Sequence, residues 1–256
     1  MILNSKSSGK GSALVFLHGL FGNGRNLYPL SMDLEREHEC ILLDLRNHGD
    51  SGHLDDFSFP LMAEDVNDTL RSLGIGKCAL IGHSLGAKAA MEYALTYPER
   101  VNGLVCLDLA PRQYKPLYTD FIQSMKSVDL KQIGSRSEAE KILLAAGIKL
   151  EEARFLLKNL VRNGPSMRWK INITGLFKNY DKIWEKIEGD RVYDGPALFL
   201  RAEHGNFILP EDIYYIKELF PSARLETVKN SGHWLHIDQT EDCLLKIKSF
   251  LKSNFI

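Results

Sequence analysis

The chain has no long apolar run. Its uninterrupted apolar stretches fall well short of the roughly 20 residues that a membrane-spanning helix requires. Residues 1–6 (MILNSK) also lack the apolar segment of a secretory signal peptide. These absences predict a protein with no membrane span, located in the cytoplasm.

An excess of charge of one sign is missing too. The chain carries 32 Lys and Arg against 33 Asp and Glu, a formal net charge of −1. This balance argues against a nucleic-acid groove and against a basic membrane-binding face, although a local patch is compatible with it. We therefore expect a small-molecule partner and no nucleic acid. Oligomeric state has no signature in the sequence.

Cysteine is scarce. The four cysteines, Cys40, Cys78, Cys106 and Cys243, include no C-x-x-C pair. Three of them lie in apolar, strand-like stretches, so we predict small core residues in a reducing compartment. No metal site and no cofactor site is predicted.

Short apolar runs of strand length alternate with helical patterns. Such runs suit strands buried on both faces of a parallel sheet, and the alternation predicts a doubly wound α/β fold. The predicted strands are residues 13–17, 41–43, 78–81, 104–107, 197–200 and 225–228. Helical stripes of apolar residues fall within 62–73, 87–95, 213–220 and 244–251.

The alternation stops between residues 111 and 194, where only helical patterns are found, at 121–125, 142–146, 155–161 and 176–187. We predict a core of residues 1–110 and 195–256 with a helical cap, 111–194, over the ends of the strands, where it lines a pocket and excludes water. The alternative is a helix bundle remote from any site. Apolar cap residues indicate an apolar ligand, although such residues also build cores: Phe121, Met125, Phe155, Leu156, Trp169, Phe177 and Trp184.

The segment Gly82-His83-Ser84-Leu85-Gly86 matches G-x-S-x-G between a predicted strand and a predicted helix. In this setting the serine sits on a sharp turn, and the glycines let neighbouring backbone approach closely. The following helix directs its N-terminal N–H groups and positive dipole end at Ser84. Ser84 is therefore the predicted nucleophile.

A nucleophilic serine needs a general base. His233, in Ser231-Gly232-His233-Trp234 after the last predicted strand, has the best position. His236 shares this loop but is interpreted as a surface residue at a helix start. His83 is expected to pack or orient beside the site.

The carboxylate that orients the base is less obvious. The strand at 197–200 continues into Arg201-Ala202-Glu203-His204-Gly205, with no Asp. The preceding strand runs directly into Asp108, whose position beside the neighbouring strand end is within reach of the histidine loop. Asp108 is the predicted acid and Glu203 the alternative, while Asp108 as a helix or turn cap stays open.

An oxyanion needs backbone donors. We predict the N–H of Leu85, directly after the nucleophile, and the N–H of Leu20 in the turn His18-Gly19-Leu20-Phe21-Gly22. A second turn, Asp44-Leu45-Arg46-Asn47-His48-Gly49-Asp50-Ser51, is interpreted mainly as scaffold.

Together these segments resemble the α/β-hydrolase superfamily and, within it, the YbfF-type esterases. The resemblance extends from about residue 13 to the end, and its more specific landmarks are Arg46-Asn47-His48-Gly49, Asp108-x-Ala110-Pro111 and Gly232-His233-Trp234-x-His236. It implies an acid after the earlier strand, which favours Asp108, and a cap inserted after the sixth strand. It also implies carboxylesterase activity on short acyl esters or acyl thioesters.

The chain departs from this family in two places. The segment before residue 13 is short, so the opening hairpin is expected to be one strand near residues 1–5. Glu203 and His204 replace smaller residues beside the site, where Trp234 and His236 are further pocket candidates.

Several rival functions share this pattern. Ser84 argues against a dehalogenase, which would need Asp in the elbow. A C–C bond hydrolase, a cofactor-free peroxidase or an acyltransferase would keep the same three residues. A non-catalytic ligand receptor is disfavoured by their presence together.

Overall fold

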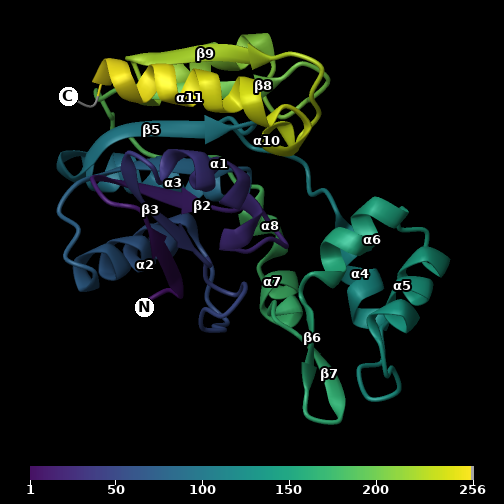
Figure 1. Cartoon of the computed structure of the whole chain (residues 1–256). Helices are drawn as coiled ribbons and strands as arrows, with labels where there is room; N and C mark the ends of the chain where they lie inside the picture. The colour runs from purple at the N-terminus through teal and green to yellow at the C-terminus, as the bar shows by residue number, and fades with distance from the viewer. Residues whose placement is uncertain (255–256) are drawn as a thin grey trace.

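The computed structural model describes residues 1–254 and is built around one seven-stranded sheet (Figure 1). The strand order is β1-β3-β2-β4-β5-β8-β9, with β1 antiparallel to β3 and the other neighbours parallel. The strands are β1 Ser5–Ser8, β2 Ser12–Leu17, β3 His38–Leu43, β4 Cys78–His83, β5 Val101–Leu107, β8 Ala197–Ala202 and β9 Ala223–Val228. All six predicted strands are confirmed.

Two apolar clusters cover the two faces of the sheet. One contains the buried sides of α2 (Phe59–Ser72), α3 (Leu85–Thr96) and α9 (Ile213–Leu219). The other contains those of α1 (Tyr28–Leu34) and α11 (Thr240–Asn254). Helices on both faces explain why the strands are apolar throughout rather than alternating. All four cysteines are buried in these layers and free, as predicted.

Helix α2 shows how local sequence sets an element. Its N-cap Ser58 accepts a hydrogen bond from Leu61 N at 3.3 Å, and Pro60 follows at the start, where its missing N–H is not needed. Val66 and Leu70 are fully buried. Gly74 adopts φ +73° just beyond the helix, a conformation suited to glycine. The predicted apolar stripe is thus the face that packs on the sheet, except for Leu73 at its end, which is exposed.

A large insertion separates β5 from β8 and lies beyond the end toward which β5 points (Figure 1). It follows the fifth strand of this chain rather than the sixth, because one strand, not a hairpin, precedes β2. Its boundaries at residues 111 and 194 stay a prediction. Its helices are α4 Thr119–Ser127, α5 Arg136–Ala145, α6 Leu150–Leu157, α7 Ile173–Lys178 and α8 Tyr180–Ile183.

The expectation of an all-helical insertion is wrong. The predicted helix at 155–161 ends at Leu157, and β6 (Leu160–Asn163) pairs antiparallel with β7 (Ser166–Trp169). The two-residue turn between them contains Gly164 at φ +60°. An Asn-Gly-Pro sequence is a hairpin signal that apolar periodicity alone overlooks. The expected helix at 176–187 is likewise divided into α7 and α8.

The first strand also differs from expectation. It occupies Ser5–Ser8 rather than residues 1–5, with Ser5 opposite Leu43 and Ser8 opposite Cys40. Gly9 and Gly11, both at positive φ, then reverse the chain into β2. In the described part of the chain, 1–254, we find no helix with the length and apolar character needed to cross a membrane.

Candidate active site

Ser84 lies on the predicted turn between β4 and α3. Its backbone has φ +53° and ψ −119°, a conformation that costs a non-glycine residue about 1–3 kcal/mol. Ser84 N donates to Leu107 O at 3.1 Å, and Ser84 O accepts from Ala87 N at 2.8 Å. The surrounding backbone therefore holds the strained turn in place, at the carboxyl end of the sheet.

Close packing explains the two glycines of the elbow. A Cβ on Gly82 would lie 2.4 Å from Gly86 O, and a Cβ on Gly86 would lie 2.1 Å from Leu17 O. Both distances are shorter than van der Waals contact allows. Only glycine at both positions lets α3 start this close to β4 and to the end of β2.

His233 and Asp108 are brought together across 125 residues of sequence. His233 Nδ1 is 2.9 Å from Asp108 Oδ2, and Asp108 is fully buried. The other carboxylate oxygen, Oδ1, accepts a hydrogen bond from Ala202 N at 2.9 Å. A carboxylate at Nδ1 selects the imidazole tautomer that leaves Nε2 free to accept a proton.

The alternative acid, Glu203, is directed elsewhere. Its Oε2 accepts a hydrogen bond from Asn230 N at 2.7 Å, and its side chain is exposed, as is that of His204. Gly205 explains why the position after β8 carries no side chain, since a Cβ there would lie 3.1 Å from Asp108 Oδ2. The Glu203 carboxylate and the His204 N–H, which donates to Ser231 O at 3.0 Å, thus brace the histidine loop. A pocket role for these two residues stays a prediction.

Sequence reasoning missed the residue that covers the His233 ring. Phe207 stacks on it with ring centroids 3.9 Å apart and an interplanar angle of 27°. Tyr114 Oη donates to Phe207 O and accepts from Ala110 N at 2.8 Å. Phe207 follows β8 in a segment with no motif, so only its spatial position reveals the contact.

The turn after β2 is fixed by two buried histidines. His18 Nε2 accepts from Leu45 N at 3.0 Å while its Nδ1 is 2.8 Å from Gly19 O. His48 Nε2 accepts from Phe21 N at 3.3 Å. Burial lowers the pKa of His18, and it lowers the pKa of His48 to about 3, so both rings stay neutral. The predicted scaffold role of the Arg46–Gly49 turn agrees with this arrangement.

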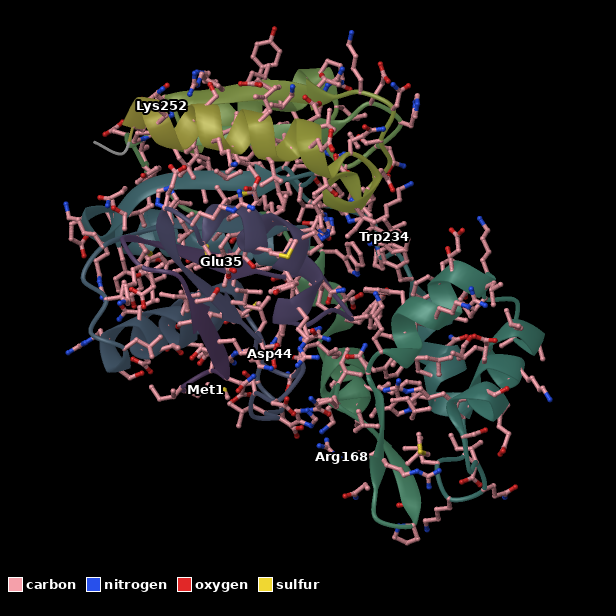
Figure 2. The ribbon with its side chains drawn as sticks, in the orientation of Figure 1. Met1, Glu35, Asp44, Arg168, Trp234 and Lys252 are labelled. Atoms are coloured by element: carbon pink, nitrogen blue, oxygen red, sulfur yellow. The ribbon has the colours of Figure 1, made fainter. Side chains whose placement is uncertain are left out.

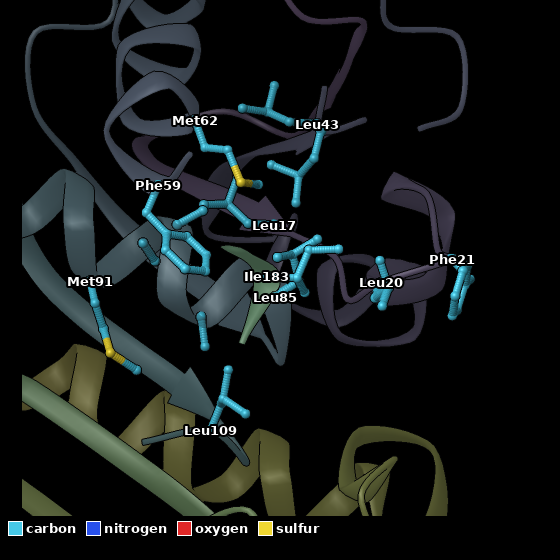
Figure 3. Packing of buried hydrophobic residues seen from close by; sticks show 14 of the residues in the cluster. Leu17, Leu20, Phe21, Leu43, Phe59, Met62, Leu85, Met91, Leu109 and Ile183 are labelled. Atoms are coloured by element: carbon cyan, nitrogen blue, oxygen red, sulfur yellow. The ribbon is translucent and has the colours of Figure 1, made fainter. Parts of the chain in front are cut away.

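The two predicted oxyanion donors are left available. Within residues 1–254, neither Leu20 N nor Leu85 N donates in the turn, loop and cap hydrogen bonds, whereas Phe21 N is taken by His48. Leu20 and Leu85 both have buried side chains in the larger apolar cluster, which also contains Leu109 and Ile183 of α8 (Figure 3).

Two further histidines pack behind the site. His83 Nε2 lies 2.9 Å from His233 O, and its ring centroid is 4.8 Å from that of His233 and 4.5 Å from that of His236. His83 therefore orients the loop, as expected. The interpretation of His236 as a surface residue is wrong, because it is buried in α10 (Leu235–Asp238), where burial lowers its pKa to about 3.

Lys88, one turn into α3, is a second buried group without a predicted role. Its Nζ donates to Glu185 O in the segment that returns from the insertion, and it lies 5.0 Å from the centroid of the Tyr114 ring. Burial lowers the pKa of Lys88 to about 7. Lys88 fastens the insertion to the helix that begins at the nucleophile.

The insertion also contacts the site at two points. Phe155 of α6 packs against Trp234 with ring centroids 5.4 Å apart, and Asn159 Nδ2 donates to Phe21 O at 2.7 Å. Figure 2 shows Trp234 at the end of the core that faces the inserted helices. The insertion thus touches the core beside the site at both points, which supports the predicted cap; that it lines a pocket and excludes water stays a prediction.

Most of the apolar residues named for the cap serve as its own core. Met125 and Leu156 are fully buried, and Trp169 and Trp184 nearly so. Phe177 is 43% exposed and lies beneath Lys126, whose Nζ is 4.2 Å from the ring centroid. Phe155 is the partly buried member that reaches toward the site.

Comparison with known proteins agrees with this architecture. The family model described as alpha/beta hydrolase fold matches residues 12–240. The sn-1-specific diacylglycerol lipase ABHD11 of Mus musculus is 37% identical over 93% of this chain and 80% of its own length. The esterase YbfF of Escherichia coli is 33% identical over 94% of this chain and 93% of its own length. A solved structure of a marine microorganism esterase superposes with a TM-score of 0.95 at 36% identity, covering 98% of this chain and 99% of that one.

The family match, the strained serine turn and the full-length superposition all point to one fold family. The chain therefore belongs to the α/β hydrolases and, within them, to the YbfF-type ester hydrolases.

Proposed function

We propose that this protein is a serine carboxylesterase that acts on apolar acyl esters through an acyl-enzyme intermediate. The observation that carries the proposal is the buried Asp108–His233 hydrogen bond of 2.9 Å beside the strained turn of Ser84. The esterase and lipase names of the relatives support an ester as the substrate.

In the first step, His233 Nε2 takes the proton of Ser84 Oγ as the oxygen attacks the acyl carbonyl. The N–H groups of Leu20 and Leu85 stabilise the resulting oxyanion. Asp108 keeps the imidazole tautomer and stabilises its charged form. Collapse of the intermediate breaks the ester bond, and His233 returns the proton to the leaving alcohol.

In the second step, water replaces the alcohol. His233 removes a proton from that water, the hydroxide attacks the acyl-enzyme, and the acid leaves while Ser84 regains its proton. The cycle needs no cofactor and no metal. An acyl thioester would follow the same route with a thiol as leaving group, and we include it as a candidate substrate.

The test is hydrolysis of p-nitrophenyl esters of increasing acyl length, beside the matching acyl-CoA thioesters, with Ser84→Ala as the control. Serine-dependent release that peaks at one acyl length is expected. Turnover no higher than that of Ser84→Ala on every ester would reject the esterase and favour a C–C bond hydrolase or a receptor.

An acyltransferase would use the same acyl-enzyme. Adding a primary alcohol during ester turnover separates the two, because a transferase makes the new ester in preference to the free acid. We expect the acid as the main product, since the proposal has water as the second nucleophile.

A further inference from the structure

The near-neutral net charge conceals an uneven distribution. Residues 111–194 carry 16 Lys and Arg against 11 Asp and Glu, a formal charge of +5, whereas the rest of the chain carries 16 against 22, a charge of −6. A molecule with one basic and one acidic part turns its basic part toward an anionic surface. The insertion is therefore the part of the molecule that an anionic partner would attract.

Within the insertion, three of the 16 cationic residues line a hollow between α5 and α6. The hollow has a volume of about 320 Å³ and contains three cationic side chains with one carboxylate. Arg154 Nε and Glu140 Oε2 bridge the two helices at 3.6 Å, and both side chains keep solvent contact. The lining residues are Arg136, Ser137, Glu140, Arg154, Leu157 and Lys158. A hollow with a surplus of two cations suits a phosphate headgroup.

Two exposed leucines lie next to this hollow on the same two helices. Leu144 lies one turn beyond Glu140 on α5, and Leu150 lies one turn before Arg154 on α6, so both leucines share the faces that carry the hollow. Leu144 is 39% exposed and Leu150 is 41% exposed. Exposed lysines, Lys141 and Lys149, stand beside them. Exposed Glu151 also follows Leu150, so one carboxylate lies among these cations. Apolar side chains next to cations are typical of a face that enters the boundary between headgroups and acyl chains.

We propose that this α5–α6 face, defined by Arg136, Leu144, Leu150, Arg154 and Lys158, docks on an anionic phospholipid surface. Phosphates occupy the hollow while the two leucines enter the apolar boundary. α6 also carries Phe155, which contacts Trp234 beside His233, so one helix connects the docking face to the site. The inference rests on the proposed function, because it assigns that site a lipid ester as substrate class.

The first experiment is flotation of the full chain with vesicles of phosphatidylcholine alone or of phosphatidylcholine mixed with phosphatidylglycerol. We expect binding to the mixed vesicles only, weakening as salt increases. The variant Arg154→Gln/Lys158→Gln should bind roughly 25-fold more weakly, at about fivefold for each cation lost. Leu144→Ser/Leu150→Ser should also weaken binding, and its loss relative to the native protein should be largest at high salt. The matched control is Lys77→Gln/Lys252→Gln, which removes two exposed cations of the core and should bind like the native protein.

The second experiment separates this inference from the proposed function. All variants should hydrolyse a water-soluble p-nitrophenyl ester at the native rate, while hydrolysis of a lipid ester within anionic vesicles should fall with binding. The docking proposal would be overturned if every variant floated equally well while turnover stayed native. It would also be overturned if the native protein floated equally well with both kinds of vesicle. Salt-sensitive binding to duplex DNA that the Arg154→Gln/Lys158→Gln variant loses, without vesicle binding, would assign the face to nucleic acid instead.

Discussion

Asp108 joins two parts of the site through a single side chain. It adopts φ +49°, a rare conformation for a residue with a side chain, and its N–H donates to Leu200 O at 2.8 Å. This backbone position delivers one carboxylate oxygen to His233 and the other to Ala202 N. The backbone strain at Asp108 is offset because both carboxylate oxygens form hydrogen bonds in a fully buried site. Glu203, the residue directly after β8, is exposed, and its Oε2 instead accepts a hydrogen bond from Asn230 N.

The choice of acid is testable by matched amide substitutions. Asp108→Asn should lower kcat for a p-nitrophenyl ester by a factor on the order of 10⁴, because an amide at Nδ1 favours the wrong imidazole tautomer. Glu203→Gln should change kcat by less than about tenfold, since its loop contact is exposed. A larger loss in Glu203→Gln than in Asp108→Asn would reverse the assignment.

The strand–turn–helix of β4 and α3 is the element that presents Ser84. Its geometry depends on the approach of α3 to β2 at Gly86, where a Cβ would lie 2.1 Å from Leu17 O and 2.6 Å from His18 O. Because His18 begins the turn that carries Leu20, one contact sets both the nucleophile and an oxyanion donor. The element and the turn are therefore mechanically coupled.

Gly86→Ala should push the start of α3 away from the end of β2. We expect a loss of about 3 kcal/mol in the free energy of unfolding, measured with urea, together with loss of ester turnover, because backbone atoms cannot yield as a flexible side chain would. Gly76→Ala is the control, since its added Cβ meets nothing within 4 Å. That control should be neutral or slightly stabilising. Equal stability of the two variants would contradict this account of the elbow.

Across the whole molecule, four buried histidines respond to acid together. Burial lowers the pKa of His18, His48, His83 and His236 below the ordinary value of 6.5. The unfolded chain therefore binds more protons than the folded chain below pH 6.5. Their contribution to stability is fully present above that pH and is lost as the pH falls below it, down to about 3 for His48 and His236.

His236→Gln tests this linkage with one residue. The lowered pKa of His236 sets the window between pH 6.5 and about 3. As the pH falls through this window, the free energy of unfolding of the variant should fall less steeply than that of the native protein. The difference should be about 1.4 kcal/mol per pH unit, the value for one proton. Denaturant unfolding at several pH values measures it. Parallel curves for the two proteins would show that His236 takes up no proton on unfolding.

Much of the structure of this protein follows from local sequence patterns. Continuous apolar runs predict the six parallel strands because both faces of the sheet are covered. Gly82–Gly86 predicts the strained turn, and Asp108 is predictable because it directly follows a strand beside that of Ser84. The β6–β7 hairpin was also readable, from Asn163, Gly164 and Pro165, but its signal lies in turn residues rather than in apolar periodicity.

The sequence by itself determined the six parallel strands, the nucleophile turn and the candidates for base and acid, since each depends on neighbours a few residues away. Only the tertiary structure decided that Asp108 rather than Glu203 meets His233, that Phe207 covers its ring, and that His236 is buried. Those contacts join segments that are distant in the chain, and no local pattern specifies them. The same is true of the α5–α6 face, because a net charge of −1 is a sum, whereas a surface is set by where folding places each charge.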